Sequence, residues 1–104
     1  MIFRLAKRAF ASAPQRALNR YKETSEKILR QDSETRLLSA ASLRDRARAL
    51  RKRVAEGADI NHFEVPTFAL VREASRRQLG EAHTPAQLVA GLAMNDGYIA
   101  EMQT

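Results

Sequence analysis

Residues 84–104 read TPAQLVAGLAMNDGYIAEMQT and hold the clearest local signals in the chain. A threonine followed by proline, with Gln87 three positions after the threonine, is typical of a helix that begins with a capping box and a proline in its first turn. Asn-Asp-Gly at 95–97 is a strong turn signal. Residues 98–102 are predicted to form a short strand. We expect that strand to lack a partner in this sequence, as it would in a truncated chain.

Upstream of this stretch, apolar spacing and capping residues predict further helices. Ser39 is the expected N-cap of a helix that Gly57 ends, and Pro66 is expected at the first position of a helix that Gly80 ends. The inner stripe of that last helix is predicted to be Phe68, Val71, Ser75 and Leu79. A helix is also expected over about residues 15–31, followed by a polar loop over 31–36, and a connector is expected over 57–65. The predicted fold class is mainly α, with four to five helices and the short C-terminal strand.

The net charge of +6 is concentrated near the N-terminus. Residues 1–22 contain six basic groups and no acid, whereas the 12 basic and 12 acidic groups after them cancel. The first ten residues, MIFRLAKRAF, have apolar side chains at helical spacing, and an apolar face beside basic groups is typical of a helix at an anionic membrane surface. The residues expected to contact the membrane are Ile2, Phe3, Arg4, Leu5, Lys7, Arg8 and Phe10. An organellar transit peptide, or a helix packed on the rest of the protein, are the alternatives.

The composition excludes several kinds of site. The chain has no cysteine, so it has no disulfide, thiol nucleophile or cysteine-based zinc site, and its two histidines are too few for a histidine-rich metal site. Only 6% of the residues are aromatic, which argues against specific nucleic-acid binding through base stacking. No apolar run approaches the roughly 20 residues that span a bilayer.

Residues 68–104 resemble the start of SecA, the ATPase motor family of bacterial preprotein translocation. The segments that carry the resemblance are FALVREASRR at 68–77, Leu79-Gly80, His83, Gln87-Leu88, Gly91 and IAEMQT at 99–104. Residues 37–57 also look like a conserved helix of the family. The resemblance implies the N-terminal part of an α/β RecA-like, DEAD-type motor domain that uses ATP and Mg²⁺. It implies as partners a translocation channel, preprotein substrates and an anionic membrane, and a location in the cytoplasm and at the inner face of that membrane.

The resemblance also divides the chain and assigns three site residues. Residues 37–104 would begin the first nucleotide-binding domain, and residues 1–36 would form a basic arm that contacts membrane or channel. Gln87 resembles the family's adenine-reading glutamine, although the capping box alone accounts for it. His83 matches a position near the base pocket, although a histidine before an N-cap is more often a loop residue. Thr104 would begin the phosphate-binding loop.

The 104-residue chain alone is not expected to catalyse ATP hydrolysis, because the phosphate-binding lysine and the magnesium-binding acids would lie beyond Thr104. The rival hypothesis is a stand-alone helical module that binds membrane or a partner and lacks ATPase activity. The run at 44–53 contains six basic groups and one acid. We interpret it as a solvated helix face, with binding of RNA or an acidic partner as the alternative.

Overall fold

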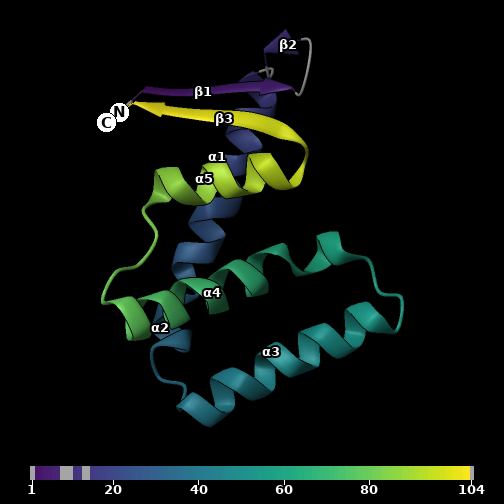
Figure 1. The fold of residues 1–104 in the computed structure, drawn as a ribbon, viewed down its shortest axis with the longest axis vertical. Helices are drawn as coiled ribbons and strands as arrows, with labels where there is room; N and C mark the ends of the chain where they lie inside the picture. The colour runs from purple at the N-terminus through teal and green to yellow at the C-terminus, as the bar shows by residue number, and fades with distance from the viewer. Residues whose placement is uncertain (1, 8–10, 13–14, 104) are drawn as a thin grey trace. The chain divides into compact units, whose positions relative to one another are not determined.

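The computed structural model describes residues 2–7, 11–12 and 15–103, and the side chains of residues 15–97 (Figure 1). The elements are β1 (Ile2–Lys7), β2 (Ala11–Ser12), α1 (Gln15–Arg30), α2 (Asp32–Thr35), α3 (Ala40–Ala55), the 3-10 helix η1 (Ile60–Phe63), α4 (Glu64–Leu79), α5 (Pro85–Asn95) and β3 (Tyr98–Gln103). The chain divides into two compact units. One consists of Met1–Glu26 with His83–Thr104, and the other of Lys27–Ala82.

The first unit contains a three-stranded antiparallel sheet in the order β2-β1-β3 (Figure 1). Strand β1 pairs with β3 along its whole length, from Ile2 opposite Gln103 to Lys7 opposite Tyr98. The predicted fold class, mainly α with a single unpartnered strand, is therefore wrong in its strand content. Strand pairing between the two ends of a chain leaves no local signal, so the partner of residues 98–103 could not be inferred from their neighbours.

The amphipathic helix predicted for residues 1–10 is wrong for residues 2–7, which form β1. Residues 1 and 8–10 lie outside the described part of the chain. Side chains repeat every two residues along a strand and not at the 3.6-residue period of a helix, so a helical pattern is no guide to a strand.

Helix α5 packs against β3 and supplies much of the first unit's core. Leu88 and Leu92, one helical turn apart, are almost fully buried. Two neighbouring residues stabilise the turn that follows α5. Gly97 has a φ of +88°, which favours glycine, and the Tyr21 hydroxyl of α1 donates a hydrogen bond of 2.7 Å to the Asp96 carboxylate. The predicted helix, turn and their residues are confirmed here.

In the second unit, α2, η1 and α3 each contact α4. Ser39 caps α3 as predicted, because its hydroxyl accepts a hydrogen bond from the Ser42 backbone N–H at 3.0 Å. Gly80 ends α4 in the left-handed conformation, with a φ of +76°. Two irregular segments were predicted wrongly: residues 31–36 include the single turn α2, and residues 57–65 include η1.

Helix α4 begins two residues before its proline. Its first residue is Glu64, so Pro66 is the third helical residue rather than the first. This is tolerated because the first four N–H groups of a helix have no intrahelical acceptor. None of the helices in the described residues is long and apolar enough to cross a membrane.

The buried face of α4 also differs from the predicted stripe. Val71 and Leu79 are 54% and 77% exposed, whereas Leu70 and Glu73 are buried. The pattern of apolar residues was misleading because a charged residue, Glu73, belongs to the inner face. Its burial is explained by two arginines that follow it on the same helix.

Candidate functional site

Gln87 lies at the N-terminus of α5, in the capping box that its sequence predicts. Its backbone N–H donates to the Thr84 hydroxyl at 3.2 Å, and its side-chain Oε1 accepts from the Thr84 backbone N–H at 2.9 Å. The side chain is exposed. Within the described residues, the Gln87 Nε2 group donates no hydrogen bond. The Oε1 atom of the amide is therefore held by the helix terminus.

This geometry fits recognition of an adenine edge. An amide oxygen has two lone pairs, so Oε1 can keep the bond to Thr84 and accept a second hydrogen bond, and Nε2 can donate. Capping and base recognition are thus compatible in one side chain. The adenine role of Gln87 stays a prediction, whereas its capping role is confirmed.

The structure says less about His83 and Thr104, the other residues predicted to contact the nucleotide. His83 immediately precedes the N-cap Thr84 and is partly buried. It lies in the same compact unit as Gln87, four positions away. Thr104 lies outside the described residues. Among the described side chains there is no cluster of three or more His, Asp or Glu residues that could hold a metal ion.

The predicted membrane-contacting side chains, Ile2 through Phe10, lie outside the described side chains. Basic groups also continue into the first turns of α1, where they are described. Arg16, Arg20 and Lys22 are exposed on that helix. The basic character of the N-terminal region is thus present on an ordered helix as well as on β1.

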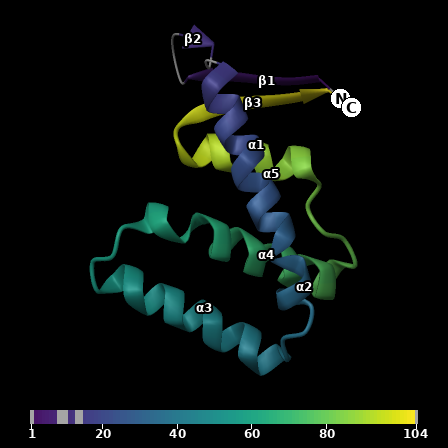
Figure 2. The same ribbon diagram turned by 180° about the vertical axis from the view of Figure 1, so that it is seen from behind.

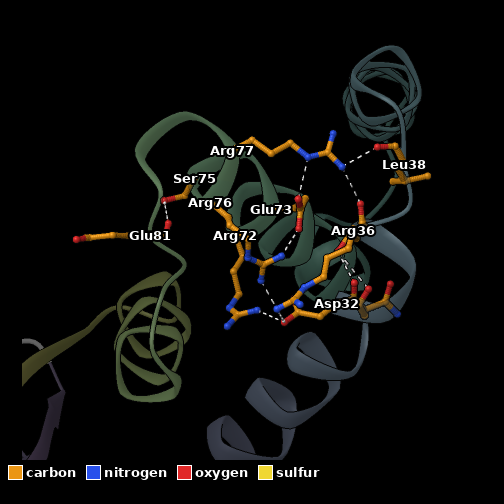
Figure 3. Close-up of polar contacts among 11 residues, drawn as sticks. Asp32, Arg36, Leu38, Arg72, Glu73, Ser75, Arg76, Arg77 and Glu81 are labelled. Atoms are coloured by element: carbon orange, nitrogen blue, oxygen red, sulfur yellow. Dashed lines mark hydrogen bonds and ion pairs between the residues drawn. The ribbon is translucent and has the colours of Figure 1, made fainter.

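The second unit contains a cluster of carboxylates and arginines that sequence reasoning missed (Figure 3). Its acids are Asp32 of α2 and Glu73 of α4, and its bases are Arg72, Arg76 and Arg77 of α4. Asp32 pairs with Arg72 and, at 3.3 Å, with Arg76. Glu73 pairs with Arg76 and, at 2.8 Å, with Arg77. Arg76 therefore joins the two carboxylates into one network.

Burial and charge explain why this cluster holds. The Glu73 side chain is 4% exposed, so its carboxylate would be costly without the two guanidinium groups that flank it. Partial burial raises the pKa of the Asp32 carboxyl, but the hydrogen bond and charge of Arg72, followed by those of Arg76, outweigh it. The pKa of Asp32 is consequently lower than its usual value.

Arg77 extends the cluster to the chain that follows α2. Its guanidinium donates to the backbone carbonyl of Thr35 at 3.1 Å and to that of Leu38 at 2.6 Å. It thereby satisfies carbonyl groups where α2 has ended. The spacing of Glu73 with Arg76 and Arg77 was a readable signal for ion pairs on one helix. Asp32 lies 40 residues from Arg72, so its part could not be read from spacing.

A comparison with protein families places α5, the turn and β3 within one matching segment. The family described as SecA DEAD-like domain matches residues 6–104. The chain belongs to the SecA DEAD-like domain family. It is 55% identical over 97 residues to "Protein translocase subunit SecA 2" of Rhodopseudomonas palustris (strain BisA53), and 38% identical over 104 residues to "Protein translocase subunit SecA 1" of Nitrosospira multiformis.

The matches cover nearly all of this chain but a small part of each relative. They include 93% and 100% of this chain, and 12% and 11% of the two SecA subunits. No solved structure matches the chain. The family resemblance deduced from residues 37–57 and 68–104 is therefore confirmed, and the activity of a whole SecA subunit is a matter for proposal.

Proposed function

We propose that this chain serves as part of a SecA-type motor that uses ATP to move preproteins across the cytoplasmic membrane. Membership of the SecA DEAD-like domain family carries this proposal. The 55% identity to a SecA 2 translocase subunit supports it further. The chain would contribute the helix that presents Gln87 to the adenine base, and the bound ATP would supply the phosphoryl transfer chemistry.

The geometry at the start of α5 supports adenine as the base that is read. The Gln87 amide is exposed and oriented by Thr84, so it loses little conformational freedom when a base binds. His83 immediately precedes the N-cap of the same helix and would border the base. Mg²⁺ would be held by groups outside the described residues. The chain by itself should hydrolyse no ATP.

A chimera tests the proposal. The 97 matching residues of the Rhodopseudomonas SecA 2 subunit would be replaced by those of this chain. Purified chimera would then be added to inner-membrane vesicles with a radiolabelled preprotein, with and without ATP. We expect ATP-dependent protection of the preprotein from protease, at a level comparable to that of the parent subunit.

The control is a chimera whose replaced segment is of equal length and helical but unrelated in sequence, which should fail. A correctly folded chimera that binds no ATP and moves no preprotein would contradict the proposal. It would favour the rival, a helical binding module without ATPase function.

We also propose that the basic N-terminal region contacts anionic phospholipid, at the inner face of the membrane where a SecA-type motor would work. The six basic groups in residues 1–22, without an acid, support this. Each basic group near an anionic surface contributes about 1 kcal/mol of attraction. Because residues 2–7 form a strand, electrostatic attraction rather than an apolar helix face is the main term of this proposal.

A further inference from the structure

Helix α3 has an apolar stripe that the described chain covers only in part. Leu43, Ala47, Leu50 and Val54 recur at spacings of four, three and four, yet no residue of α3 is buried. A helix of this length in a protein is normally stabilised by packing of its apolar stripe. We therefore expect the stripe to pack against an additional surface.

One side of this stripe forms the wall of an open groove. Helices α3 and α4 lie side by side and are joined through η1 (Figures 1 and 2). The groove has a volume of about 480 Å³, and its lining includes Leu50, Val54, Ile60, Phe63, Leu70 and Val71. Ile60 and Val71 are 61% and 54% exposed. Large apolar side chains with such exposure, gathered in one concave site, are typical of a docking surface.

Three arginines share one face of α3, and one of them lines the groove. Arg44, Arg48 and Arg51 lie at positions i, i+4 and i+7, and all three are exposed. Arg51 lines the groove itself. The acid nearest this row in sequence is Asp45, which makes an exposed ion pair with Arg48 at 3.4 Å. Helix α3 contains six basic groups and this single acid, so its field at the groove is positive.

The remaining arginines of α3 make contacts within the second unit. Arg46 pairs with Glu34 at 2.7 Å, and the Arg53 guanidinium lies 4.9 Å from the centre of the Phe63 ring. These contacts leave the row of Arg44, Arg48 and Arg51 as the accessible positive edge of the groove. Its occupant must therefore combine apolar side chains with negative charge on one side.

We propose that this groove binds an amphipathic helix of a partner protein, with its apolar residues between α3 and α4 and its carboxylates against Arg44, Arg48 and Arg51. The lining residues of α3 extend from Ala47 to Ala55, which at 1.5 Å per residue is about two helical turns. That length accommodates anchors at i, i+3 or i+4 and i+7 of a bound helix. A concave groove receives a convex helix ridge better than the flat surface of a bilayer.

Fluorescence anisotropy with two synthetic 18-residue peptides tests the proposal on the intact chain. One peptide has leucines at helical spacing with glutamates beside them, and the other has lysines in place of the glutamates. We expect the acidic peptide to bind at least about tenfold more tightly, since three exposed ion pairs together are of that order. The difference should shrink as salt is added, because exposed charges are screened.

Charge reversal supplies the matched control. The triple variant Arg44→Glu/Arg48→Glu/Arg51→Glu should reverse the preference between the two peptides. Arg16→Glu/Arg20→Glu/Lys22→Glu makes the same change in net charge on α1 and should leave the preference unaltered. Val71→Asp should weaken the binding of both peptides. If the circular dichroism spectrum of Val71→Asp shows unfolding, Ile60→Asp is used in its place. Both apolar sites are exposed in the free chain.

Four results would overturn the proposal. Equal affinity for both peptides would remove the charge argument, and an equal effect of the two triple variants would make the attraction non-specific. Self-association of the chain in sedimentation equilibrium, abolished by Val71→Asp, would identify a second copy as the occupant. Binding to phosphatidylglycerol vesicles that requires Arg44, Arg48 and Arg51, without peptide binding, would identify a membrane surface instead.

Discussion

Asp32 is a carboxylate whose ionised form is stabilised by two arginines. Arg72 and Arg76 lie against it, and its pKa is lowered. In the unfolded chain the carboxyl has its ordinary pKa of about 3.9. As pH falls, the unfolded state therefore takes up the proton first. The stabilisation is complete above that pH and is lost as pH falls through the lower pKa of the folded chain.

The substitution Asp32→Asn should consequently have a pH-dependent cost. Near pH 7 we expect a loss of about 1–3 kcal/mol in the free energy of unfolding, because two partly buried guanidinium groups lose a charged partner. The difference from the parent chain should decline below about pH 4. Urea unfolding between pH 3 and 7 measures it. Asp45→Asn, at an exposed ion pair, serves as control and should show little change at any pH.

At Gln87, nucleotide preference separates base recognition from capping. In the SecA chimera, Gln87→Ala should weaken ATP binding by about 1–3 kcal/mol and GTP binding by less, since guanine has a carbonyl where adenine has an amine. Thr84→Ala breaks the same capping box but keeps the amide. Binding of fluorescent ATP and GTP analogues measures both. If the two variants affect both nucleotides alike, Gln87 has only its capping role.

At the scale of the element, helix ends are set by single residues. At the start of α5, the Thr84 hydroxyl accepts a hydrogen bond from the Gln87 backbone N–H. In the isolated chain, Thr84→Ala should lower the free energy of unfolding by about 1 kcal/mol. Thr67→Ala, an exposed threonine within α4, is the control and should change stability by less than about 0.5 kcal/mol. Equal losses at both sites would mean that the cap contributes nothing.

The elements also show what the sequence could predict. Ser39, Gly80 and Thr84 mark helix ends through bonds to residues a few positions away, so these ends could be located from local patterns. Strand β1 could not, because its ladder is made with residues 98–103. Residues 2–7 fit a helix by their local pattern, but pairing with a distant segment places them in a strand.

The candidate sites divide in the same way. Gln87 could be found because its capping partner and its family motif both lie within a short stretch. The cluster around Asp32 and Glu73 could not, since it joins α2 to α4 across some 40 residues. A buried acid at Glu73 also contradicts the expectation that charged residues lie outside. Only the contact between these helices reveals the ion pairs of Asp32, whereas those of Glu73 lie within α4.

At the scale of the whole molecule, the uneven charge predicts salt-sensitive membrane binding. The chain should sediment with phosphatidylglycerol liposomes, detach as salt is raised, and ignore phosphatidylcholine liposomes. Arg16→Glu/Arg20→Glu/Lys22→Glu should reduce binding strongly, because it changes half of the basic groups in residues 1–22. A matched triple reversal of Arg44, Arg48 and Arg51 should reduce it less. Equal reduction, or binding to neutral liposomes, would contradict a membrane contact at the N-terminal region.

The pairing of β1 with β3 has a mechanical consequence. Ile2 lies opposite Gln103 in an antiparallel ladder, so the start of β1 and the end of β3 are at the same end of the ladder. A tension applied between these residues acts across the strands, along the hydrogen bonds, and loads one end of the ladder first. The bonds should then open one after another, as a zipper does, instead of sharing the load. With optical-tweezers handles near residues 2 and 103, we expect this sheet to open in the first and weakest step, before α5 unravels.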